Sequence, residues 1–368
     1  MAEHDHTDDA GAVRWAQRVR QVWRSQGVRG IGQRILGRMS RSDEAGKENE
    51  SYKKWVELYD TLTDSDRRGI RERIDHFDSQ PIISVIMPVY NTEEVWLRRA
   101  IESVRRQLYP KWELCIADDC STAPHVRQVL EEYASKNQRI KVVFRQGNGH
   151  ISAASNSALE VATGEFVALL DHDDELTEHA LYMVAEELNS FPEADLIYSD
   201  EDKLNAKSER VSPHFKTDWN PDLFYSLNFI SHLGVYRRKI LQEIGGFREG
   251  YEGSQDYDLA LRVVERIPER NIRHIPHVLY HWRELPTSVG FDINAKSYAH
   301  ENARRAIRSH FERTEKVAAI VPGYFIFHRA IYPIPEPAPL VSLIVAANGN
   351  VAALLPLIEG ILDRTDYE

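Results

Sequence analysis

The chain has 368 residues, of which 42% are hydrophobic and 28% are charged. These proportions are ordinary for a soluble globular protein with enough apolar material for a core, and the length suggests two or three domains. The formal net charge of −11 argues against a general nucleic-acid-binding protein. The two cysteines form neither a disulfide framework nor a zinc site, which favours a reducing compartment.

The N-terminal segment, residues 1–50, differs in composition from the rest of the chain. Residues 1–41 contain eight arginines and four acidic residues, a net charge of +4, which leaves −15 for the remainder. We expect residues 1–11 to be disordered. In residues 12–41, tryptophan and valine recur at helical spacing among arginines, and such an amphipathic segment can lie on an anionic membrane surface. A solvated helix that packs on its own protein is an equally weighted alternative.

The sequence shows neither the pattern of a transmembrane helix nor that of a secretory signal. No run of about 18 apolar residues is present, so no transmembrane helix is expected. The first residues are acidic and contain histidines, unlike the apolar core of a secretory signal. We therefore predict a cytoplasmic protein, with peripheral contact at the inner face of the plasma membrane if residues 12–41 bind lipid.

A polar stretch, residues 42–50, precedes a predicted helical lead-in over residues 51–80. We expect this lead-in to pack against the main domain through one apolar face. The residues that share the face are Trp55, Leu58, Tyr59 and Leu62.

The main domain is predicted to cover residues 81–330 and to start with an almost continuously apolar strand, Ile82–Val89. Such strands are typical of parallel sheets buried on both faces. Strands and helices then alternate, which predicts an α/β fold: an open, mostly parallel, Rossmann-like sheet with helices on both faces. Further strands are expected at 112–117, 140–144 and 166–170, and helices at 95–104 and 152–162.

Acidic residues gather where two of these strands end, which is where ligands bind in open α/β sheets. The motif Asp171-His172-Asp173-Asp174-Glu175 follows the strand at 166–170. Its carboxylates repel one another unless a cation joins them, and oxygen ligands on a polar loop suit Mg²⁺ or Mn²⁺. The alternative is an acidic helix N-terminus.

Two other acidic groups have weaker patterns. Asp118 and Asp119 end the strand at 112–117 and can accept hydrogen bonds from a ribose or a base, or can simply form a turn. The run Ser199-Asp200-Glu201-Asp202 is interpreted as a solvated turn, with contact to an acceptor or a base as the alternative.

Three other features also carry chemistry. The loop Gln146–Ser152 only partly matches G-x-G-x-x-G, although a helix that starts there can face phosphates. Asp256 precedes an apolar helical run, as a cap would, or acts as a general base. His281 and Arg283 end a strand; His281 is a candidate metal ligand and Arg283 a candidate diphosphate clamp, whereas packing in the core is the alternative for the histidine.

As a set, these motifs resemble the family 2 glycosyltransferases of the GT-A fold over about residues 81–285. The context Asp-Tyr-Asp-Leu and His-Trp-Arg is most similar to bacterial enzymes that build O-antigen and related surface polysaccharides, including rhamnosyltransferase-type members. The matching segments, in the family's order, are Pro88-Val89-Tyr90-Asn91, Ala117-Asp118-Asp119, Asp171-His172-Asp173-Asp174 and Gln255-Asp256.

The resemblance implies roles for individual residues. Asp256 matches the catalytic base, and Asp171 and Asp173 match a metal-binding D-x-D, with Asp173 the expected direct ligand. His281 is added to the expected metal ligands. The expected donor-binding residues are Pro88, Tyr90, Asn91, Asp118, Asp119, Asp171 and Arg283. Two positions depart from the family pattern: Gln255 replaces a glutamate beside the base, and Ser155 replaces an arginine in the helix after the Gly-rich loop.

A short internal repeat marks the C-terminal end. Pro81-Ile-Ile-Ser-Val-Ile-Met is echoed by Pro339-Leu-Val-Ser-Leu-Ile-Val, and Ile101-Glu-Ser-Val by Ile358-Glu-Gly-Ile. Residues 339–368 therefore resemble the truncated start of a second GT-A-like repeat. Either the chain is a fragment of a tandem two-domain enzyme, or this copy is vestigial; without a D-x-D it is not catalytic.

The sequence thus predicts a metal-dependent, inverting glycosyltransferase. Its donor would be a UDP- or dTDP-sugar, and its acceptor a saccharide, either free or lipid-linked, of a bacterial surface polysaccharide. Mn²⁺ or Mg²⁺ would be the cofactor. A non-catalytic carbohydrate-binding or scaffold protein with a degenerate GT-A domain is the alternative.

Overall fold

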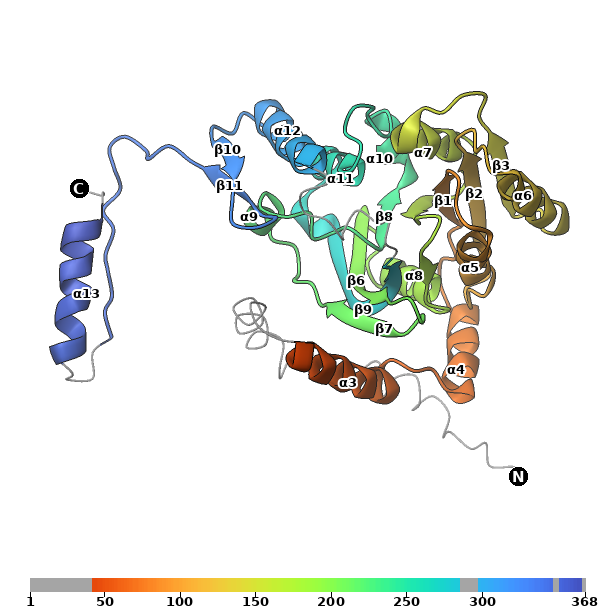
Figure 1. Cartoon of the computed structure of the whole chain (residues 1–368), viewed down its shortest axis with the longest axis horizontal. Helices are drawn as coiled ribbons and strands as arrows, with labels where there is room; N and C mark the ends of the chain where they lie inside the picture. The colour runs from red at the N-terminus through yellow and green to blue at the C-terminus, as the bar shows by residue number, and fades with distance from the viewer. Residues whose placement is uncertain (1–41, 285–296, 347–350, 366–368) are drawn as a thin grey trace. The chain divides into compact units, whose positions relative to one another are not determined.

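The computed structural model describes residues 42–284, 297–346 and 351–365 (Figure 1). The predictions for residues 1–41, including the amphipathic membrane segment, lie outside these described residues. The chain divides into two compact units, one ending at Ile331 and the other covering Tyr332–Glu368. Each unit is considered by itself. Among the described residues, no helix combines the length and the apolar character needed to cross a bilayer.

The first unit contains one large sheet, a small hairpin and ten α-helices within the described residues. The strands are β1 (Ile83–Val89), β2 (Trp112–Asp118), β3 (Ile140–Phe144), β4 (Phe166–Leu169), β5 (Glu175–Leu176), β6 (Leu196–Leu204), β7 (Arg210–His214), β8 (Gly234–Arg237), β9 (Ile272–Arg283), β10 (Ala319–Pro322) and β11 (His328–Ile331). The helices are α3 (Ser42–Tyr59), α4 (Asp64–Asp75), α5 (Glu94–Arg105), α6 (Pro124–Lys136), α7 (His150–Glu160), α8 (Ala180–Ser190), α9 (Pro221–Phe224), α10 (Arg238–Glu243), α11 (Gln255–Val264) and α12 (Ser297–Arg313).

The large sheet has nine strands in the order β3-β2-β1-β4-β8-β6-β9-β5, with β7 paired to β6. The pairs β1–β2, β2–β3, β1–β4 and β6–β9 are parallel, whereas β8 is antiparallel to both β4 and β6. Strands β1, β2, β3, β4, β6 and β9 therefore all run in one direction, so the predicted mostly parallel α/β sheet is confirmed. Their carboxyl ends meet at one edge of the sheet.

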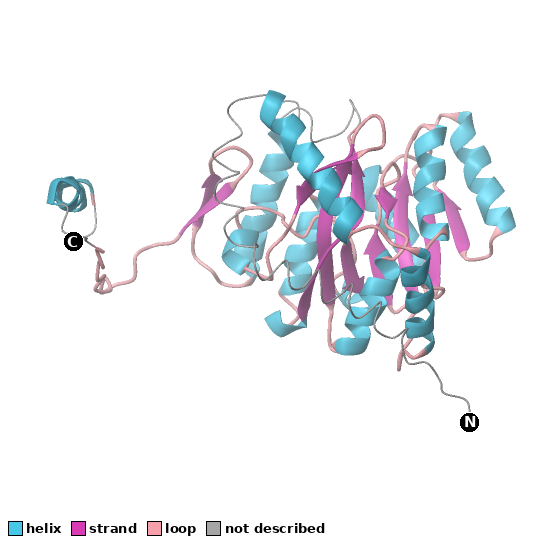
Figure 2. Ribbon diagram, turned by 90° about the horizontal axis from the view of Figure 1, so that it is seen from below, coloured by secondary structure: helices cyan, strands magenta, loops and turns pink. Residues whose placement is uncertain are grey.

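Helices cover both faces of this sheet (Figure 2). Alternate residues of β1 face opposite sides: Val85 and Met87 belong to one core cluster, and Ile86 to the other. The first cluster includes apolar residues of α4, α5, α6 and α8, and the second those of α7, α10, α11 and α12. Both faces of a parallel strand are thus removed from water, which explains the continuous apolar run at 83–89.

Strand β6 corrects one interpretation made from the sequence. The acidic run Asp200-Glu201-Asp202 is a buried part of this central strand, not a solvated turn. Each carboxylate has a basic partner: Asp200 bonds His274 at 2.9 Å, Glu201 pairs with Lys216 at 3.2 Å, and Asp202 with Arg210 at 2.6 Å. Buried charges are tolerated because they are paired and hydrogen-bonded.

The N-terminal extension is helical from Ser42, so the polar stretch expected to separate two segments is part of α3. The lead-in contains two helices, α3 and α4, rather than one. Leu58 is 72% exposed, because the packed face is formed by Tyr52 and Trp55, whose rings contact Phe215 just beyond β7. Helix α4 begins with a reciprocal capping box between Thr63 and Asp66.

The second unit is small. Residues 339–346, where the repeat predicts a strand, have no regular secondary structure, whereas α13 (Val351–Arg364) contains the echo of the α5 sequence. Several apolar side chains of the unit are exposed, including Leu340 and Ile344, each at 96%. The assignment of residues 339–368 to the start of a second GT-A-like repeat remains a prediction.

Candidate active site

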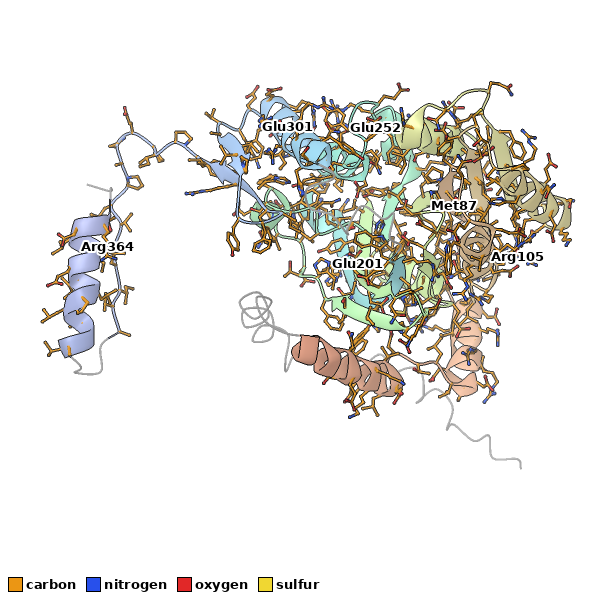
Figure 3. All side chains as sticks on the ribbon, in the orientation of Figure 1. Met87, Arg105, Glu201, Glu252, Glu301 and Arg364 are labelled. Atoms are coloured by element: carbon orange, nitrogen blue, oxygen red, sulfur yellow. The ribbon has the colours of Figure 1, made fainter. Side chains whose placement is uncertain are left out.

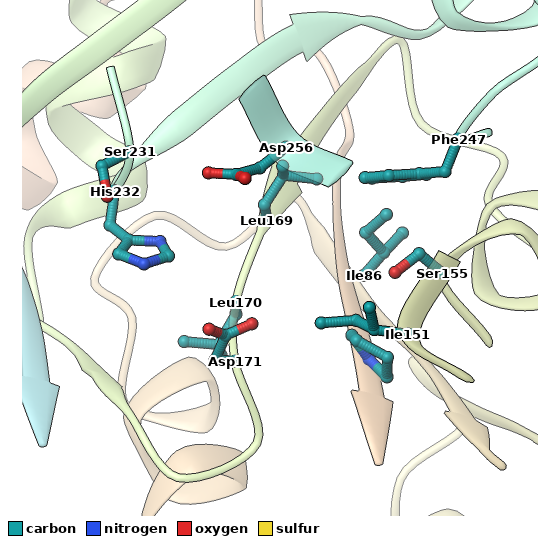
Figure 4. A pocket seen from close by; sticks show the side chains of 11 residues that line it. Ile86, Ile151, Ser155, Leu169, Leu170, Asp171, Ser231, His232, Phe247 and Asp256 are labelled. Atoms are coloured by element: carbon teal, nitrogen blue, oxygen red, sulfur yellow. The ribbon is translucent and has the colours of Figure 1, made fainter. Parts of the chain in front are cut away.

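A pocket lies where the carboxyl ends of β1 and β4 meet the start of α11 (Figure 4). Polar groups from distant parts of the chain face it together with apolar side chains. Its lining residues are Ile86, Pro88, Ile151, Ser155, Leu169, Leu170, Asp171, Ser231, His232, Phe247 and Asp256. Of the site residues expected from the sequence, the structure brings Pro88, Asp171 and Asp256 together here.

The loop after β4 is fixed by hydrogen bonds to β9. The Tyr280 hydroxyl donates to Asp174 Oδ2 at 2.6 Å and accepts from the Asp171 N–H at 3.2 Å. The Arg283 N–H donates to Asp174 Oδ1 at 2.7 Å. Asp174 is fully buried, and burial with two neighbouring carboxylates raises its pKa well above the usual range. This residue ties the loop to the sheet and is not part of an acidic helix start.

Asp171, Asp174 and His232 form a possible cation site. One ligand atom from each lies within 4.8 Å of the others. The Nδ1 atom of His232 is buried and has no hydrogen-bond partner among the described residues, so this nitrogen is available to a ligand. Both oxygens of Asp174 already accept hydrogen bonds, so Asp171 and His232 are the better ligands. One carboxylate and one imidazole fit Mn²⁺ or Mg²⁺ that also binds a diphosphate.

His281 is not part of the group formed by Asp171, Asp174 and His232, which corrects its expected role as a metal ligand. Neighbouring side chains of a strand point to opposite faces, and Tyr280 already faces Asp174. The His281 ring therefore points to the other side of β9, where Nδ1 lies 2.5 Å from Asp202 Oδ1. Asp173 is also outside the group of three; its Oδ1 lies 3.6 Å from His172 Nδ1. Sequence reasoning missed His232, a single histidine before a short apolar strand.

Arg283 supports the loop and does not reach the pocket, so its expected role as a diphosphate clamp is corrected too. Its guanidinium is 1% exposed and lies 4.1 Å above the Trp96 ring. It forms an ion pair with Glu175 and donates through Nε to the Asp173 carbonyl at 3.0 Å. Through these contacts the side chain holds the C-terminal end of the loop after β4.

Asp256 is the second residue of α11, and Ser254 occupies the N-cap position. The helix-cap interpretation of Asp256 is therefore wrong. Its Oδ2 accepts a hydrogen bond from the side chain of Asn228 at 2.7 Å. Burial raises the pKa of Asp256, whereas His232 acts in the opposite direction. Figure 4 shows Asp256 and Asp171 at two ends of the pocket, with His232 to one side. A carboxylate with a raised pKa is suited to accept a proton.

The loop after β1 joins the start of α6. Asn91, at φ +50°, accepts hydrogen bonds from the backbone N–H groups of Thr122 and Ala123 at 2.8 and 3.0 Å. Helix α6 lacks a side-chain cap of its own, so Asn91 supplies it from a distant position. Tyr90 is 45% exposed and available to a ligand.

The two aspartates after β2 are both buried. Asp118 accepts from the Ser121 N–H at 3.2 Å and so forms the turn considered from the sequence. Asp119 accepts from the Gly149 N–H at 3.0 Å and pairs with Arg145 at 2.8 Å. A carboxylate and a guanidinium therefore lie together at the carboxyl edge. Arg145 follows the end of β3 and places a positive charge near α7. In α7 this chain has Ser155 at the position where the family pattern has an arginine.

Known structures and a family model identify the class of protein to which this fold belongs. A crystal structure of residues 1–349 of Staphylococcus aureus TarS in complex with UDP-GlcNAc has a TM-score of 0.50, with 24% identity, over 62% of this chain and 66% of that one. The fold of the first unit is thus that of the GT-A glycosyltransferases, as the sequence predicts. Residues 84–245 match the family model "Glycosyl transferase family 2", so the chain carries a domain of this family.

Curated relatives extend the similarity to most of the chain. The y4gI protein of Sinorhizobium fredii, which is uncharacterised, is 48% identical over 300 residues, and the O-antigen biosynthesis protein RfbC of Myxococcus xanthus is 36% identical over 302 residues. Each alignment covers 81% of this chain, but the chain spans only 33% and 23% of the two relatives. WcaA of Escherichia coli, a putative colanic acid glycosyl transferase, is 28% identical over 217 residues, covering 54% of this chain and 74% of WcaA.

Proposed function

We propose that the chain is an inverting glycosyltransferase that transfers a sugar from UDP or dTDP to a saccharide acceptor during synthesis of a bacterial surface polysaccharide. The observation that carries the proposal is the pocket in which Asp256, Asp171 and His232 face one another at the carboxyl edge of the sheet. The names of the M. xanthus and E. coli relatives support the polysaccharide context.

The chemistry needs a base and a means of stabilising the leaving group. A hydroxyl of the acceptor attacks the anomeric carbon, the bond to the diphosphate oxygen breaks, and Asp256 accepts the hydroxyl proton. A divalent cation held by Asp171 and His232 would offset the charge that develops on the diphosphate. Among the described residues that line the pocket, the carboxylates are Asp171 and Asp256. With Asp256 as the base and Asp171 as a ligand, neither is left to form a covalent intermediate, which supports a single displacement that inverts the anomeric centre.

Donor contacts are proposed for the carboxyl ends of β1 and β2. Tyr90 offers an exposed ring, and Pro88 lines the pocket. The Asp119–Arg145 pair offers hydrogen-bond acceptors and donors to a nucleobase. Asn91 and Asp118 act on the donor indirectly in this proposal, because their side chains hold the loops that contact it.

The direct test is release of UDP or dTDP from a panel containing UDP-GlcNAc and dTDP-rhamnose, with Mn²⁺, by the whole chain. Asp256→Asn should lower kcat by about 10²–10⁴-fold, the typical contribution of a general base. Asp222→Asn, at an exposed position of the nearby α9, is the matched control and should retain the rate of the parent. A folded parent that binds saccharides yet releases no nucleotide would favour the non-catalytic carbohydrate-binding alternative.

A further inference from the structure

The loop between α9 and β8 brings two side chains to the pocket. Asn228 donates to Asp256 Oδ2 at 2.7 Å, and its own Oδ1 accepts from the Ser231 N–H at 3.3 Å. The ring of His232 stacks on Tyr280, with centroids 4.4 Å apart and planes 12° apart. The position of this loop therefore sets the surroundings of both the base and the cation site.

A buried ion pair between Lys216 and Glu201 holds this loop in place. The ammonium of Lys216 donates to the carbonyls of Ile230, at 2.8 Å, and of His232. Its third partner is Glu201 Oε2, at 3.2 Å, and the same oxygen accepts from the His232 N–H at 3.1 Å. The side chain of Lys216 has no exposed surface, and Glu201 lies within the body of the domain (Figure 3).

Packing alone does not require this pair. An apolar pair of similar volume would fill such a site at equal or lower free energy, because burying two charges is costly. The ammonium has three donors, and all three are used: one on Glu201 and two on backbone carbonyls of the loop. The pair also does not line the pocket. Its contacts instead determine where residues 230–232 lie.

We infer that Lys216, with Glu201, is a positioning residue that fixes the loop bearing Asn228 and His232 against Asp256 and Asp171. This inference rests on the proposed function and adds two residues to it that touch neither donor nor acceptor. Without the ammonium, the carbonyls of Ile230 and His232 lose their donor. Glu201 loses its lysine partner and keeps only His214, at 3.4 Å, and the N–H of His232. The loop then shifts, and both His232 and the hydrogen bond from Asn228 move with it.

The first experiment compares Lys216→Met with the parent, using the donor that the parent hydrolyses. We expect kcat to fall at least tenfold and the Mn²⁺ concentration for half-maximal rate to rise at least fivefold. A purely structural role would lower the melting temperature and the amount of folded protein, but would leave the Mn²⁺ requirement of the folded fraction unchanged. Calorimetric titration of Mn²⁺ in the presence of UDP checks the second expectation without turnover.

Lys141→Met is the matched control. Lys141 also donates to a buried glutamate, Glu113, at 2.7 Å and to a backbone carbonyl, that of Val161, at 3.0 Å. This second pair lies at the start of β2, away from the carboxyl edge, and has no contact with the pocket residues. The control should lose melting temperature as Lys216→Met does, while keeping the kcat and the Mn²⁺ requirement of the parent.

The double variant Glu201→Gln/Lys216→Met also removes the buried charge of Glu201 and should recover much of the lost melting temperature. We expect its kcat and Mn²⁺ requirement to stay as poor as those of the single variant, because the loop carbonyls still lack their donor. If folded Lys216→Met, or the double variant, had the kcat and the Mn²⁺ requirement of the parent, the inference would be overturned and the proposed function would stay intact. Absence of donor hydrolysis in the parent would instead remove the proposed function itself.

Discussion

The side-chain amide of Asn228 donates a hydrogen bond of 2.7 Å to Oδ2 of Asp256. A neutral donor at this position stabilises the ionised carboxylate, the form that acts as a base, and opposes the effect of burial, which raises the pKa of Asp256. The contact comes from a loop 28 residues before Asp256 in the chain. It therefore connects the loop held by Lys216 with the proposed chemistry.

Replacement of Asn228 by aspartate tests this relationship. A second carboxylate beside Asp256 disfavours ionisation and raises the pKa of the pair. Because the base works when deprotonated, the acidic limb of the kcat–pH profile should move to higher pH by about one unit or more. Asn228→Ala should lower kcat and should move the acidic limb of the kcat–pH profile by less than Asn228→Asp does. Identical acidic limbs in Asn228→Asp and the parent would show that Asp256 does not control this limb.

Glu113 gives a prediction for stability against pH. Burial alone would raise its pKa, but Lys141, the Thr163 N–H and the Ser84 hydroxyl outweigh burial and lower the pKa to about 2. The folded-state pKa is thus below that of the unfolded chain. The stabilisation is complete above about pH 5 and is lost as the pH falls toward 2. In urea unfolding at pH 7, Glu113→Gln should be less stable by roughly 2 kcal/mol, and the difference should shrink at pH 3.

The attachment of α3 depends on Arg210. Its guanidinium pairs with Asp60 at 2.5 Å and with Asp202 at 2.6 Å, and the Tyr52 hydroxyl donates to Asp202 at 2.6 Å. Arg210→Met removes the basic partner of the buried Asp60 and leaves Asp202 with His281 as its basic partner, so it should cost about 3–5 kcal/mol of unfolding free energy. Tyr52→Phe removes one hydrogen bond and should cost about 1 kcal/mol. Equal losses in the two variants would contradict this assignment.

Gly164 lies where two backbones approach each other before β4. A Cβ there would come within 2.5 Å of the Ile82 carbonyl oxygen and 2.9 Å of the Ser84 nitrogen. Gly164→Ala should therefore destabilise the domain by about 1–3 kcal/mol, the usual cost of overpacking. Gly147→Ala is the control, because its added Cβ would meet no atom within 4 Å. Thermal melts of the two variants provide the comparison.

The sequence predicted the half of the sheet that contains β1 to β4, because each apolar run there ends sharply in a polar or acidic residue. Asp118 and Asp171 follow two such runs, and parallel pairing brings their ends to one edge. Local pattern was sufficient here, since helices and strands alternate along the chain and the residues of β1 and β2 are buried on both faces.

The other half of the site depends on contacts between residues that are distant in sequence. The acidic run in β6 has the composition of a surface turn, and partners outside the run, among them Lys216, Arg210 and His274, make its burial possible. His232 comes just before β8, and the antiparallel pairing of β8 with β4 brings it beside Asp171. A single histidine in the sequence does not indicate such a contact. Alternation along β9 explains why His281, expected to be a metal ligand, contacts Asp202 instead.

The most direct test of the account is nucleotide binding by isothermal titration calorimetry. UDP and dTDP are titrated with and without Mn²⁺ into the parent chain, Asp171→Ala and the control Asp222→Asn. The account predicts binding of one of the two nucleotides that requires Mn²⁺, is lost in Asp171→Ala and is kept in the control. A folded parent that binds neither nucleotide, or binds one regardless of Mn²⁺ and of Asp171, would contradict it.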